Sequence, residues 1–197
     1  MNFRTNLSKE RNIPVSALYA VLFLGLIIGS IFNTVIDLKH CPIILTQNVA
    51  PINADISLLD SFKCSLCVYI AFLSAFALTG LFTFGQVFSV LLLAFRGFAM
   101  GFSICSVYTS LGAKAIIPLA VVVLPKLIAV SVIFVLGARE AVRLSSNLFS
   151  FLFFGKNDDD IKNKTRLYFI KFSILAVFAV VTATAESALT YFFIDLF

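Results

Sequence analysis

The stretch CSLCVYIAFLSAFALTGLFTFGQVFSVLLLAFRGFAMGFSICSVY, residues 64–108, decides the fold of this chain, because Arg96 is its only charged residue. As a single α-helix this stretch would be roughly 65 Å long, about twice the thickness of the hydrocarbon core of a bilayer. It must therefore fold back once, and the expected turn is Thr83-Phe84-Gly85-Gln86. We predict two membrane-spanning helices here, at about 64–84 and 86–109.

The rest of the chain follows the same pattern. Apolar segments at about 15–36, 115–137 and 168–194 are each long enough to cross a bilayer, and the first is too long for a signal peptide. A shorter apolar stretch, 148–154, either extends the fourth segment or lies at the interface. The chain is 60% hydrophobic and only 13% charged. We predict an all-α, polytopic membrane helix bundle with about five transmembrane helices, forming a single domain over residues 1–197.

Lys and Arg residues in the loops and near the ends of the predicted spans are unevenly distributed. If the N-terminus is cytoplasmic, only Lys39, Lys63 and Lys114 lie outside the cell. The cytoplasmic side then holds ten basic residues: Arg4, Lys9, Arg11, Arg139, Arg143, Lys156, Lys162, Lys164, Arg166 and Lys171. This bias predicts a cell-membrane protein with a cytoplasmic N-terminus and an extracytoplasmic C-terminus. The net charge of +5 lies at span ends and not in one patch, so we expect no nucleic-acid partner.

Aromatic residues give a further indication of the span limits. All five tyrosines, at positions 19, 69, 108, 168 and 191, fall near the ends of predicted spans. An amphipathic ring is favoured at the membrane–water interface, so this pattern supports the predicted limits.

Three charged residues, Arg96, Lys126 and Glu186, lie inside predicted spans. A charge at mid-bilayer costs about 2.5–3.5 kcal/mol, so such residues face the protein interior and find partners. They fit a buried ion pair or triad, a path for a substrate or ion, or pairing with a partner protein's helix. For Glu186 we expect Arg96 or Lys126 as the partner, with Lys114 as the fallback. Pro125, beside Lys126, and Pro118 are positions at which the fourth span could break.

Glycines four residues apart occur twice, as Gly25 and Gly29 in the first span and as Gly97 and Gly101 in the third. In lipid, such small residues allow two helix backbones to approach closely. The pattern fits helix packing within the chain or the contact of a homodimer.

The cysteines and the remaining motifs give little support for an enzyme. Cys64 and Cys67 share a helix face near the outer surface, with Cys41 and Cys105 as the other two cysteines. The four cysteines fit three interpretations: small apolar packing residues, one structural disulfide, or a quinone-linked redox site. The chain has one histidine, His40, and no metal-protease, nucleophile-elbow or phosphate-loop motif. We therefore expect no catalytic residue, cofactor or metal site.

Two motifs resemble a known family. The segment Arg96-Gly97-Phe98-Ala99-Met100-Gly101-Phe102 and the later Leu124-Pro125-Lys126 resemble the core of the stage II sporulation protein M family. The last span with Glu186 resembles that family's final helix. The resemblance implies a non-enzymatic membrane scaffold that recruits or anchors the peptidoglycan-degrading D and P proteins during engulfment in sporulation. The alternative is a transporter or channel-like subunit that uses Arg96, Lys126 and Glu186.

Overall fold

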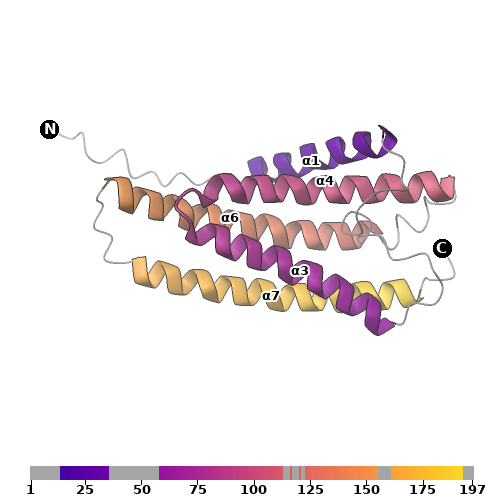
Figure 1. Ribbon diagram of the computed structural model, residues 1–197. Coiled ribbons are helices and arrows are strands. Elements are labelled where there is room, and N and C mark those ends of the chain that lie inside the picture. Colours follow the sequence, from indigo (N-terminus) through magenta and orange to yellow (C-terminus); the bar gives the residue numbers. More distant parts are fainter. Residues whose placement is uncertain are drawn as a thin grey trace.

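The computed structural model describes residues 14–35, 58–112, 116, 120, 123–154 and 161–192. These residues form five long helices and no strand (Figure 1): α1 (Val15–Val35), α3 (Leu58–Leu81), α4 (Gly85–Leu111), α6 (Leu124–Phe154) and α7 (Ile161–Phe192). The helices run roughly side by side in an elongated bundle. The predicted all-α helix bundle is therefore confirmed.

The outer surface of the bundle is apolar and its interior holds charges, the reverse of a water-soluble protein. Leu91 and Val177 are 65% and 64% exposed, whereas Arg96, Lys126 and Glu186 are buried. Four helices are long and apolar enough to cross a membrane, over residues 15–34, 62–81, 85–109 and 163–189. Helices satisfy their own backbone hydrogen bonds, which hydrocarbon requires. The chain is a multi-pass membrane protein.

Helix α6 lies between α4 and α7 in the bundle and also packs against α1 and α3 (Figure 1). It is not one of the four apolar helices, because every 18-residue stretch of it contains at least three charged residues. Its middle is nevertheless apolar and buried, as Val130, Phe134 and Ala138 show. Of its charges Lys126 is buried among neighbouring helices, Arg139 and Glu140 are partly buried, and Arg143 is exposed. That α6 is a fifth membrane crossing stays a prediction.

The limits of α6 differ from the predicted fourth span, 115–137. The helix begins at Leu124 and continues through residues 148–154, the first of the two arrangements expected for that stretch. Pro125 lies in the first turn of the helix. Backbone N–H groups in a first turn have no partner within the helix, so the N–H that proline lacks is not missed, and its fixed φ suits a helix start. Lys114 and Pro118 lie outside the described residues.

A tight turn joins α3 to α4 at residues 82–84, within one or two residues of the predicted position. The hydroxyl of Ser145, from α6, donates to the carbonyl oxygens of Phe82 (2.8 Å) and Thr83 (3.1 Å). It also accepts from the backbone N–H of Gln86 at 3.0 Å. Ser145 is fully buried, so this hydroxyl takes the place of water at the two helix ends. One side chain thus fixes the turn against the central helix.

Candidate functional site

The carboxylate of Glu186, on α7, is the centre of a buried polar cluster. Its Oε1 accepts from the Lys126 ammonium of α6 and from the Ser65 hydroxyl of α3, the latter at 2.9 Å. Its Oε2 accepts from the Tyr69 hydroxyl of α3 at 2.5 Å. Glu186 is only 6% exposed. Side chains from three helices therefore meet at one carboxylate.

These contacts supply what a carboxylate needs outside water. Desolvating two charges costs several kcal/mol per ion, and their attraction offsets this only when the remaining lone pairs are also hydrogen-bonded. Both oxygens of Glu186 are occupied, by Lys126, Ser65 and Tyr69. The cluster also fixes the relative position of α3, α6 and α7, because a shift of any one helix would leave a buried polar atom unpaired.

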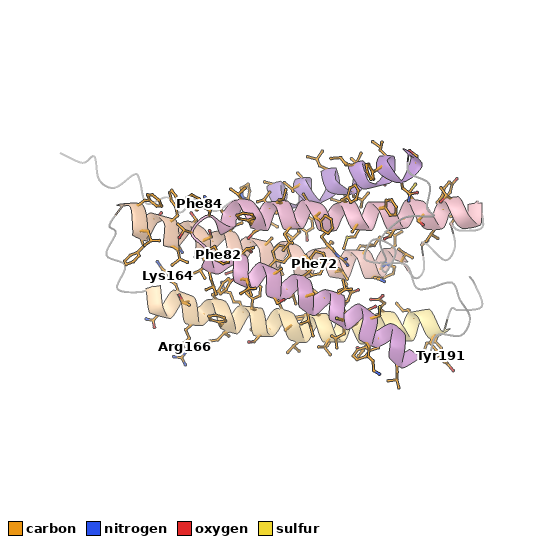
Figure 2. The ribbon with its side chains drawn as sticks, in the orientation of Figure 1. Phe72, Phe82, Phe84, Lys164, Arg166 and Tyr191 are labelled. Carbon is orange, nitrogen blue, oxygen red and sulfur yellow. The ribbon has the colours of Figure 1, made fainter. Side chains whose placement is uncertain are left out.

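Arg96, on α4, is buried (1% exposed) in a different environment. The carbon of its guanidinium lies 5.0 Å from the centre of the Phe72 ring on α3 and 5.1 Å from that of Phe134 on α6. Figure 2 shows Phe72 near the middle of the bundle. A cation between two aromatic faces gains about 2 kcal/mol or more when desolvated. Among the described residues no carboxylate pairs with Arg96, and its Nε has no hydrogen-bond partner.

The aromatic ring of Phe134 joins the two charged regions. It contacts the Arg96 guanidinium, and its centre lies 6.2 Å from that of the Tyr69 ring in an edge-on arrangement. Tyr69 in turn donates to Glu186. The three intramembrane charges predicted from the sequence therefore belong to one connected interior, in which Lys126 pairs with Glu186 and Arg96 is held by aromatic rings.

The four glycines of the two small-residue patterns lie at the contact of α1 with α4. A Cβ added at Gly25 or Gly29 would overlap the carbonyl oxygens of Ala94 or Phe98 on α4. A Cβ at Gly97 or Gly101 would overlap the carbonyl oxygens of Leu22 or Leu26 on α1. The two backbones touch because both helices present hydrogen atoms where side chains would stand. Both glycine faces are thus covered within one chain.

Ser65, Phe72 and Phe134 were not singled out in the sequence, and Tyr69 was noted only as a tyrosine near a span end, although all four surround the charges. Ser65 and Tyr69 are four residues apart, so one helix face presents both hydroxyls, and this spacing was the available signal. Tyr69 and also Tyr168, placed at the interface from the sequence, are buried at 2% and 3% exposure. Tyr168 donates to the carbonyl oxygens of Phe76 and Ala77. A buried tyrosine hydroxyl that has a hydrogen-bond partner does not need to lie at the membrane–water interface.

The cysteines do not assemble into a recognisable centre in the described part of the chain. Cys64 and Cys67 lie on α3 and Cys105 on α4, and no disulfide joins these three to one another. Within the described ranges no group of three or more His, Cys, Asp or Glu side chains is arranged to hold a metal ion. Cys41 and His40 lie outside the described residues.

No family model matches this chain, and comparisons with curated proteins and with solved structures return no match. The likeness to the stage II sporulation protein M family therefore rests on the motifs at residues 96–102 and 124–126 and on Glu186.

Proposed function

We propose that this protein is a non-enzymatic scaffold of the cell membrane, which positions partner proteins through its helices and loops. The carboxylate of Glu186, which accepts hydrogen bonds at both oxygens, is the observation that supports this function best. In the described part of the chain the hydrogen bonds that it accepts come from Ser65, Tyr69 and Lys126. Charges used in this way hold helices in register and leave little capacity for a passing ion.

The orientation in the membrane is part of this proposal. Arg139 lies at the middle of α6 and Arg143 in its C-terminal half, and Lys164, Arg166 and Lys171 lie in the first third of α7. The C-terminal end of α6 and the start of α7 are both at the left of Figure 1. Figure 2 shows Lys164 and Arg166 at that end and Tyr191 at the other. The positive-inside rule makes the basic end cytoplasmic. The N-terminus is then cytoplasmic and the C-terminus extracytoplasmic if α6 is the fifth span.

The partners are proposed from the family resemblance. By that resemblance the scaffold recruits the peptidoglycan-degrading D and P proteins during engulfment. The apolar outer faces of α3, α4 and α7 would lie in the lipid bilayer, and a membrane-anchored partner would reach the protein within it. A homodimer would form through a surface other than the glycine contact of α1 with α4.

Cross-linking in native membranes, followed by purification and mass spectrometry, tests the scaffold. We expect a membrane-anchored cell-wall hydrolase to be recovered in stoichiometric amount. The same partner should be recovered with a folded Lys126→Gln/Glu186→Gln double variant, since the cluster serves the bundle and not the partner. Recovery of the chain alone from cross-linked membranes would contradict the proposal.

A second candidate function is transport, and Arg96 is the observation that favours it. A buried guanidinium without a carboxylate partner among the described residues leaves a positive charge able to attract an anion. Flux of a chloride or phosphate tracer into proteoliposomes tests this function. Uptake that is lost in a folded Arg96→Gln variant, with no partner recovered, would favour transport over the scaffold.

A further inference from the structure

An apolar groove of about 480 Å³ runs along the contact of α6 with α7. Its walls include Val132 and Leu136 of α6 and Ile174 of α7, which are 40%, 38% and 52% exposed on the apolar outside of the bundle. Apart from Thr182, its lining is hydrocarbon until it reaches Glu140 and Lys171 at one end. The groove is therefore open to lipid along its side and polar only at that end.

A smaller polar pocket of about 100 Å³ continues from that end and shares Glu140 and Lys171 with the groove. It is lined in addition by Arg143 and Lys164, with Asn147 beside them. Among the described residues that line it there are three cations and one carboxylate, whose formal charges sum to +2. Lys171 donates to Glu140 at 2.6 Å, which uses one of its three donors.

We propose that this groove and pocket together bind one anionic phospholipid. The phosphate lies in the pocket among Arg143, Lys164 and Lys171, and an acyl chain lies in the groove along Val132 and Leu136. Two observations select this occupant. The order of the surface, hydrocarbon first and cations at its end, matches the order of a phospholipid from tail to head. The net positive charge matches an anionic headgroup, and basic pockets between membrane helices bind such headgroups.

The position in the fold fits the same occupant. On α7 the pocket occupies the first part of the apolar span, residues 163–189, and we place the lipid headgroups at this depth. Figure 2 shows Lys164 on the side of α7 that faces α6 and Arg166 on the opposite side. This arrangement supplies a matched control, because Lys164 lines the pocket and Arg166, two residues later, does not.

Native mass spectrometry of the whole chain in mild detergent tests the headgroup site. The probes are phosphatidylglycerol and phosphatidylcholine with identical acyl chains. We expect the wild type to retain one phosphatidylglycerol and to bind phosphatidylcholine more weakly. One cation at a headgroup corresponds to about a fivefold change in affinity. Lys164→Gln should therefore weaken phosphatidylglycerol binding about fivefold, and Arg166→Gln should leave it unchanged.

The groove has its own matched pair of variants. Val132→Phe fills the groove, whereas Val177→Phe adds the same ring at an exposed position of α7 outside it. We expect only Val132→Phe to reduce lipid retention. This pair also keeps the proposal testable if Lys164→Gln fails to fold.

Three outcomes would overturn the lipid site. They are equal retention of the two lipids, equal weakening by Lys164→Gln and Arg166→Gln, and no effect of Val132→Phe. A lipid-free dimer that Val132→Phe dissociates would also overturn it, since a second copy of the chain would then occupy the groove.

Discussion

Breaking the buried ion pair should destabilise the bundle more than removing it entirely. Glu186→Gln leaves the Lys126 ammonium buried beside a neutral amide, and Lys126→Gln leaves the carboxylate without its cation. Lys126→Gln leaves both oxygens of Glu186 as acceptors for Ser65 and Tyr69, whereas Glu186→Gln leaves only one oxygen, so one of these two hydrogen bonds from α3 is lost. The double variant carries the same loss as Glu186→Gln, so a double-mutant cycle isolates the charge pair from the rest of the cluster.

The expected size follows from the burial of the pair. Both side chains are less than 10% exposed, so water would not hydrate a charge that lost its partner. Removing one partner of a buried pair costs about 3–5 kcal/mol. The double variant places two amides in contact and buries no charge, so it should lose less than either single variant. The resulting coupling energy, the sum of the two single losses minus the loss of the double variant, should be at least about 3 kcal/mol.

Unfolding by sodium dodecyl sulfate in mixed micelles, followed by far-ultraviolet circular dichroism, measures these free energies. The chain has no tryptophan, so helix content is the practical signal. Glu140 and Lys171 provide the control pair, because Lys171 is 43% exposed and such pairs contribute only about 0–1 kcal/mol. Additive losses for Glu186 and Lys126, or a coupling no larger than that of the control pair, would refute the reasoning.

Three other variants test the packing and the orientation. Gly101→Ala should destabilise the bundle by about 1–3 kcal/mol, because the added Cβ meets the backbone of α1. Gly137→Ala should have little effect, because its Cβ would meet only side chains, at 3.6 Å or more. Equal thermal stability of the two variants in detergent would contradict this prediction. Ser145→Ala should lower the free energy of unfolding by about 1–3 kcal/mol, because the backbone groups of the α3–α4 turn lose their hydrogen-bond partner. In circular-dichroism melts, replacement of the neighbouring serine, Ser146→Ala, should cause a smaller loss of stability. A cysteine placed at Asn157 in a cysteine-free variant should resist membrane-impermeant reagents applied from outside, and outside labelling would reverse the proposed orientation.

The sequence by itself determined the fold class and the approximate helices. A chain that is 60% hydrophobic cannot cover itself with polar surface, and apolar runs of bilayer length must be helical because lipid offers no backbone hydrogen bonds. The turn near Phe84 followed from the length of the run that contains it. The charges Arg96, Lys126 and Glu186 were also evident, because a charge stands out in an apolar run.

Only the tertiary structure decided which of these residues meet. The sequence left Arg96 and Lys126 as equal candidates for Glu186, and the structure pairs it with Lys126 and places Arg96 between Phe72 and Phe134. The reason is physical: periodicity shows which face of a helix is special, but not which neighbour that face meets. That choice depends on how five helices pack at once, which is also why the central position of α6 was not evident from its sequence.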